Sequence, residues 1–137
     1  MKRLNSNDQI VLLLILIILA GLVLRCWNAI EIPFTFDELS AMSRTQFDSF
    51  KELISVGIIK KDSHPAGIQV FLYYWVMFFG EREIVVKLPF IVAGLVSIYL
   101  VYRIGELWFG KTAGILTAAY ISSLQLFVMY SQIARPY

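Results

Sequence analysis

The stretch IVLLLILIILAGLVL, residues 10–24, decides the fold of this chain. It contains no charged side chain, and crossing a hydrocarbon core of about 30 Å takes about 20 apolar helical residues. Arg25 and Trp27 follow the stretch, and such residues are typical of the membrane interface. We therefore predict a membrane-spanning helix over about residues 9–30, with Arg25 reaching toward the interface beside Trp27.

A cleaved signal peptide would also contain an apolar stretch near the N-terminus. However, Arg25 stands directly before Cys26, where lipoprotein-type cleavage requires a small residue, and no A-x-A pattern follows. We therefore expect the span to be retained. Cys26 is the single cysteine, so it cannot form a disulfide within the chain, and we predict no role for it.

The composition of the whole chain also indicates a lipid environment. Hydrophobic residues make up 58% of the sequence, charged residues only 16%, and the mean hydropathy is +0.71, values that exclude an ordinary soluble domain. The net charge of +2 is small, and the basic residues are scattered. Nucleic acid is therefore not an expected partner, whereas the lipid bilayer is.

Three more apolar segments are predicted to be helices, at about residues 66–79, 84–102 and 113–130. The last two contain pairs of small residues four apart, Ala93 with Ser97 and Gly114 with Ala118, which predict contacts between helices. The expected fold class is all-α, with polytopic membrane helices. Segment 66–79 would be about 21 Å long as a helix, shorter than the hydrocarbon core, so the sequence leaves three and four spans open.

The polar stretch of about residues 31–65 follows the first span. Lys2 and Arg3 precede that span, and positive charge favours the cytoplasmic side. We therefore expect a cytoplasmic N-terminus and an extracytoplasmic loop at 31–65.

Within this loop, apolar residues recur near helical spacing from Leu39 to Ile58, which predicts an amphipathic helix lying in the membrane interface. Thr35 and Glu38 have the spacing of a capping box, so this helix is expected to begin at Phe36 or Asp37.

Asp37 and Glu38 are the first candidates for chemistry. Acidic residues at a helix N-terminus are stabilising whatever the function, so a purely structural role stays open. A carboxylate at the membrane surface can instead act as a general base toward an acceptor hydroxyl, or contribute to a divalent metal site. Asp37 is the candidate metal ligand; no cofactor is otherwise indicated.

Three basic groups are candidates for binding phosphate. His64 and Lys61 lie in the strip before segment 66–79, where they are either polar loop residues or phosphate contacts. Arg135 follows the last apolar segment, and its guanidinium suits bidentate pairing with phosphate oxygens, although a surface arginine is the simpler interpretation.

Together these motifs resemble the start of the GT-C superfamily of membrane glycosyltransferases, particularly the protein O-mannosyltransferases and the bacterial aminoarabinose and related lipid A transferases. The motifs that carry the resemblance are Phe36-Asp37-Glu38, His64-Pro65-Ala66, Phe79-Gly80-Glu81-Arg82-Glu83, Lys87-Leu88-Pro89, Trp108-Phe109-Gly110 and Ala134-Arg135-Pro136-Tyr137.

The resemblance implies sugar transfer from a polyprenyl-phosphate donor to a lipid, glycan or protein acceptor on the outer face of the plasma (inner) membrane. It implies catalysis at Asp37 with its neighbour Glu38, and places Arg135 and Tyr137 near the donor. His64 matches an H-P-P element, in which Ala66 here replaces the second proline.

Relatives of this kind have more spans than 137 residues can hold. The resemblance therefore implies that residues 1–137 are the N-terminal part of one GT-C-type transmembrane domain, inactive alone. The alternative is a small non-catalytic membrane scaffold or subunit, in which the Asp-Glu pair only caps a helix. A transporter would be expected to carry ionisable residues inside its spans, which are absent apart from Lys87.

Overall fold

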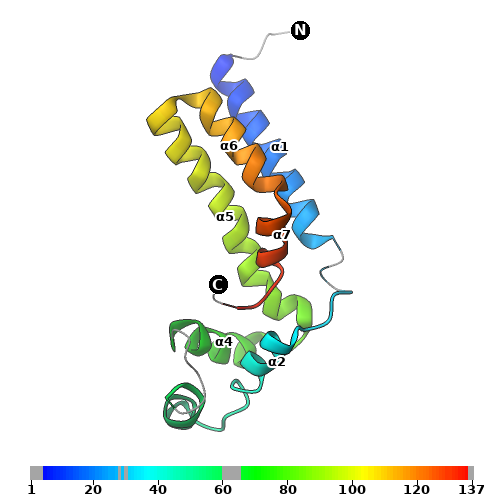
Figure 1. Cartoon of the computed structure of the whole chain (residues 1–137), viewed down its shortest axis with the longest axis vertical. Helices are drawn as coiled ribbons and strands as arrows, with labels where there is room; N and C mark the ends of the chain where they lie inside the picture. Colours follow the sequence, from blue (N-terminus) through cyan, green and yellow to red (C-terminus); the bar gives the residue numbers. More distant parts are fainter. Residues whose placement is uncertain (1–4, 28, 30, 60–65, 136–137) are drawn as a thin grey trace. The chain divides into compact units, whose positions relative to one another are not determined.

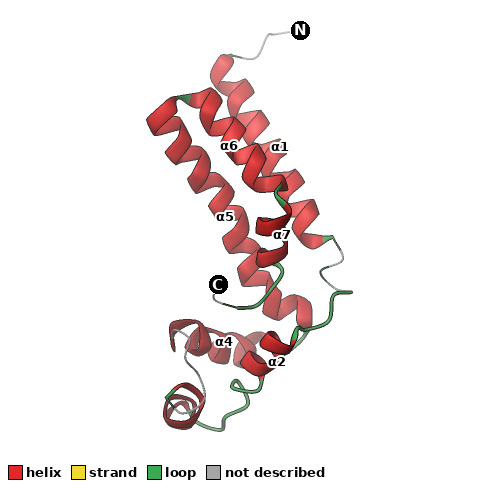
Figure 2. Ribbon diagram, in the orientation of Figure 1, coloured by secondary structure: helices red, strands yellow, loops and turns green. Residues whose placement is uncertain are grey.

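The computed structural model of the chain describes residues 5–27, 29, 31–59 and 66–135. These residues form helices and loops and contain no strand, which confirms the all-α prediction (Figure 2). The elements, most of which are labelled in Figure 1, are α1 Ser6–Cys26, α2 Phe36–Met42, α3 Phe50–Glu52 with a π-helical segment Leu53–Ile58, α4 Ala66–Phe79, α5 Glu83–Phe109, α6 Lys111–Ser123 and α7 Gln125–Ser131.

Two of the described helices, α1 and α5, are long and apolar enough to cross a membrane. They contain 21 and 27 residues, or about 32 and 40 Å. Helices α6 and α7 meet at a bend of 61° and count as a third span only if the bent pair is taken as one. Helix α4, with 14 residues, is shorter than a span, so the described helices provide two spans, or three at most.

Two predicted segments differ from the observed helices. Helix α5 extends beyond residue 102 to Phe109, and Arg103 and Glu106 pair one turn apart within this extension, at 3.2 Å, which favours it slightly. The segment predicted at 113–130 is interrupted at Leu124, whose backbone is extended with a ψ of 119°.

The chain divides into two compact units. We call Met1–Asn28 with Phe90–Gln132 the bundle unit, and Ala29–Pro89 with Ile133–Tyr137 the loop unit. Each is described by itself.

Small residues allow close helix packing in the bundle unit. A Cβ atom added to Gly114 of α6 would lie 2.7 Å from the carbonyl oxygen of Tyr102 in α5. Gly114 and Ala118, predicted from their spacing to be a helix contact, are both buried, which confirms that prediction. The other predicted pair, Ala93 with Ser97, is exposed instead, and the neighbouring Gly94 makes the contact with Ser131.

Arg25 does not reach toward the interface as predicted: it is 1% exposed. Its Nη1 donates to the carbonyl oxygens of Gly21 and Ser122 at 3.2 and 3.0 Å, and its Nη2 to that of Ile121 at 3.5 Å. The break at Leu124 deprives the last carbonyls of α6 of helical partners, so a cation from α1 caps them. Trp27 is 68% exposed, and its place at the membrane interface stays a prediction.

The loop unit contains two short helical segments where one amphipathic helix was predicted. Helix α2 ends at Met42, and the next segment starts at Phe50, after Ser49 caps it through a hydrogen bond from the Glu52 N–H at 3.2 Å. Gln69 of α4 donates to the carbonyl oxygen of Ala41 at 2.9 Å and thereby ties the end of α2 to α4.

Candidate functional site

Helix α2 begins where the capping box predicts. The hydroxyl oxygen of Thr35 accepts from the Glu38 N–H at 3.3 Å, and Oε2 of Glu38 accepts from the Thr35 N–H at 2.9 Å. The same Oε2 accepts from the Thr35 hydroxyl at 2.9 Å. These reciprocal bonds satisfy N–H groups that a helix end leaves unpaired, so the helix starts at Phe36.

The second carboxylate oxygen of Glu38 binds a distant part of the chain. Oε1 accepts from the backbone N–H of Ala134 at 2.8 Å, across 96 residues, and Glu38 is 1% exposed. Glu38 therefore joins the start of α2 to residues 133–135 within the loop unit. No local sequence pattern indicates this contact, because its partner is a main-chain group.

Asp37 and Arg135 lie together as a consequence. Nε of Arg135 donates to the backbone carbonyl oxygen of Asp37 at 3.0 Å, and Nη2 lies 3.9 Å from Oδ1 of the Asp37 side chain. The Arg135 side chain is 6% exposed and that of Asp37 is 51% exposed. The arginine is therefore held in place, while the aspartate remains accessible to a substrate.

Lys87 is a further buried cation in the loop unit. It is 0% exposed, its Nζ donates to the carbonyl oxygen of Ile32 at 2.6 Å, and it lies 5.7 Å from the centre of the Phe34 ring. The contacts attach the chain just before α2 to the start of α5, and so support the position of Asp37.

Three of the predicted site residues, Lys61, His64 and Tyr137, lie outside the described residues. Among the residues that the structure describes, no three His, Cys, Asp or Glu side chains come close enough to hold a metal ion. The metal contact suggested for Asp37 stays a prediction.

The aromatic side chains of α4 pack against one another and their neighbours. The ring of Trp75 lies 5.6 Å from that of Phe71 and 4.3 Å from that of Phe79, and its Nε1 donates to the carbonyl oxygen of Val85 at 2.8 Å. These contacts are typical of aromatic side chains that pack helices together.

The profile of one protein family, described as dolichyl-phosphate-mannose-protein mannosyltransferase, matches residues 63–136. The match covers α4 to α7 and Arg135, and begins after Asp37. Neither a curated protein nor a solved structure gives a match. Because the matched residues are more than half of the chain, it belongs to the dolichyl-phosphate-mannose-protein mannosyltransferase family and is a multi-pass membrane glycosyltransferase of the GT-C type.

Proposed function

We propose that this chain takes part in transferring a sugar from a polyprenyl-phosphate donor to a hydroxyl of a lipid, glycan or protein acceptor, on the outer face of the plasma membrane. The observation that carries the proposal is the position of the accessible Asp37 carboxylate beside the fixed Arg135 guanidinium, 98 residues later in the chain. A base and a phosphate-binding cation must both lie near the anomeric carbon for such a transfer.

In the proposed reaction, Asp37 accepts the proton of the acceptor hydroxyl while the oxygen of that hydroxyl forms a bond to the anomeric carbon. The bond between that carbon and the donor phosphate oxygen breaks, and the polyprenyl phosphate leaves with the electron pair. Arg135 stabilises the charge that develops on the leaving phosphate, a task that suits a planar guanidinium already fixed by the protein.

The two acidic residues have different roles in this proposal. Both oxygens of Glu38 accept hydrogen bonds within the protein, and the residue is buried. We assign Glu38 to positioning, since it fixes the start of α2 and the backbone next to Arg135. Asp37, with half of its side chain exposed, is the base.

The remaining substrate contacts are proposed from the resemblance of their motifs. Lys61 and His64 precede α4, and Tyr137 follows Arg135 by two residues. We propose that these side chains bind the donor on its phosphate side. The donor's polyprenyl tail stays in the bilayer, which explains why a transferase of this kind is embedded in a membrane.

The test compares native cells with cells from which the gene encoding this chain has been deleted. Mass spectrometry of their lipids, glycans and proteins identifies the glycosylated product that is lost. The deletion cells then receive a copy of the gene that carries Asp37→Asn. We expect the product's formation rate to fall by on the order of 10²- to 10⁴-fold, because general base catalysis contributes about that much.

The matched control is Asp48→Asn, which alters an exposed acid of the same unit. It should restore the product fully. If no glycosylated product is lost on deletion, the transferase proposal is wrong; if Asp37→Asn restores normal formation, Asp37 is not the base.

A further inference from the structure

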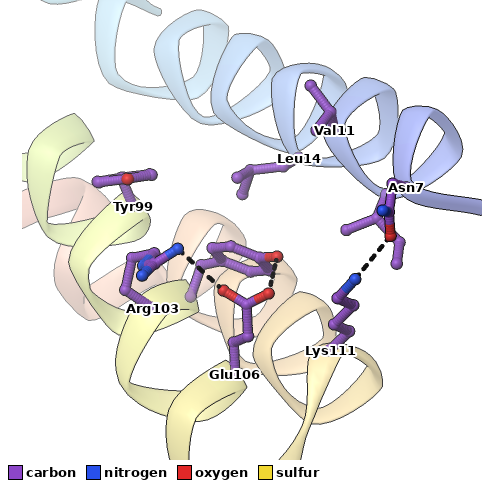
Figure 3. A pocket seen from close by; sticks show the side chains of 9 residues that line it. Asn7, Val11, Leu14, Tyr99, Arg103, Glu106 and Lys111 are labelled. Carbon is purple, nitrogen blue, oxygen red and sulfur yellow. Dashed lines mark hydrogen bonds and ion pairs between the residues drawn. The ribbon is translucent and has the colours of Figure 1, made fainter.

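A groove of about 350 Å³ lies in the bundle unit, between the start of α1, the last turns of α5 and the start of α6 (Figure 3). None of the candidate site residues lines it. Apolar side chains of α1, the ring of Tyr99 in α5, and charged side chains of α5 and α6 line the groove, among them Val11, Leu14, Arg103, Glu106 and Lys111.

The charged groups of the groove leave it positive. Glu106 already accepts from the Tyr102 hydroxyl at 3.0 Å and pairs with Arg103 at 3.2 Å. Lys111 reaches across to α1 and donates to the side-chain oxygen of Asn7 at 2.7 Å, a neutral partner (Figure 3). Two cations therefore face one carboxylate, which favours an anionic ligand.

The groove is amphiphilic. Val11 is 56% exposed, and with Leu14 and Tyr99 it provides an apolar wall next to the two cations. A ligand that fills such a groove needs a negatively charged head and a hydrocarbon chain.

Neighbouring residues indicate that the groove opens at the membrane interface. Trp108 and Phe109, at the end of α5, are 74% and 76% exposed, and exposed aromatic rings at the end of a span are typical of the headgroup layer. Lys111 comes directly after the turn at Gly110, whose φ is +88°. Lysines at such positions extend toward lipid headgroups.

We propose that this groove binds an anionic glycerophospholipid of the cytoplasmic leaflet. The lipid phosphate lies against Lys111 and Arg103, and one acyl chain lies along Val11 and Leu14. Lys2 and Arg3 are near the same end of α1 in sequence, which favours the cytoplasmic leaflet, where anionic lipids are abundant. This proposal does not depend on the proposed sugar transfer.

Native mass spectrometry of the purified protein tests the proposal, with phosphatidylglycerol and phosphatidylcholine of the same acyl chains as probes. We expect phosphatidylglycerol to bind more tightly, and Lys111→Gln to weaken it about fivefold, since one cation near anionic lipid contributes about 1 kcal/mol. Arg82→Gln, at an exposed arginine outside the groove, is the control and should leave binding unchanged.

A second pair of variants tests the apolar wall without changing charge. Val11→Trp should fill the groove and reduce phosphatidylglycerol binding several-fold. Val23→Trp, on the same helix and 59% exposed, lies outside the groove and should not. Thermal unfolding of each variant in phosphatidylcholine alone shows whether it is folded.

Equal affinity for the two lipids would overturn the proposal. Equal losses of phosphatidylglycerol binding in the groove variants and in their controls would also overturn it. Displacement of the bound lipid by millimolar inorganic phosphate would mean that the site recognises phosphate alone, and this would also contradict it.

Discussion

Glu38 is the residue on which the geometry of the candidate site depends most. It accepts three hydrogen bonds, from the Thr35 N–H, the Thr35 hydroxyl and the Ala134 N–H. A buried carboxylate is costly unless its oxygens are paired in this way. The neighbouring Asp37 is left accessible because Glu38 takes the inward position.

We expect Glu38→Gln to lower the free energy of unfolding by about 1–3 kcal/mol, because charged hydrogen bonds are lost and an amide N–H group then faces backbone donors. Thermal unfolding in detergent measures this loss. Glu52→Gln, at an exposed glutamate of the same unit, should change stability little. Equal stability of the two variants would show that the three bonds do not hold α2.

Arg135→Lys tests the need for a guanidinium. Lysine keeps the positive charge but loses the planar fork that reaches the Asp37 backbone and side chain together. We expect the rate of product formation in restored cells to fall by about 10- to 100-fold, since one fixed donor contributes up to about 10³-fold. Arg82→Lys serves as the control, and an unchanged rate for Arg135→Lys would remove Arg135 from the reaction.

At the scale of single elements, the capping pattern predicted the start of its helix, whereas interactions between residues far apart in the sequence were not predicted. The capping box predicts the start of α2 correctly because its two partners lie three residues apart. The break at Leu124 carries neither Pro nor Gly, and Arg25, which caps it, lies 97 residues from Ser122. The proximity of Asp37 to Arg135 likewise arises from tertiary structure.

Helix packing shows a second limit of sequence patterns. Residues 10–24 of α1 are apolar on all sides, because lipid and neighbouring helices are both apolar surroundings, so periodicity does not reveal the buried face of the helix. The spacing of small residues predicted the contact at Gly114 and Ala118 correctly. It also predicted a contact at Ala93, whereas Gly94 makes the contact, because neighbouring residues of a helix lie on different faces.

Gly114→Ala should separate α5 from α6. Its Cβ would lie 2.7 Å from the Tyr102 carbonyl oxygen, a main-chain atom that cannot turn aside. We expect a loss of about 1–3 kcal/mol in stability, as for other overpacked sites. Gly67→Ala, on α4 with nothing within 4 Å of the new Cβ, is the matched control and should be neutral or stabilising. Equal unfolding temperatures would mean that the close approach is not required.

At the scale of the whole molecule, composition and hydropathy predicted an all-α membrane protein, and the motifs predicted its superfamily. Residues 63–136 carry the family match, whereas Asp37 lies before it. The proposed reaction requires Asp37 on the outer face of the membrane, because the donor and acceptor are proposed to meet there.

Cysteine labelling in intact cells measures directly on which side of the membrane the loop that contains Asp37 lies. In a Cys26→Ser background, Asp48→Cys introduces an exposed thiol in the loop unit, and Asp8→Cys introduces one in the first turn of α1. We predict that a membrane-impermeant maleimide labels Cys at position 48 in intact cells and Cys at position 8 only after permeabilisation. The reverse pattern would place Asp37 on the cytoplasmic side and contradict the proposed outer-face transfer.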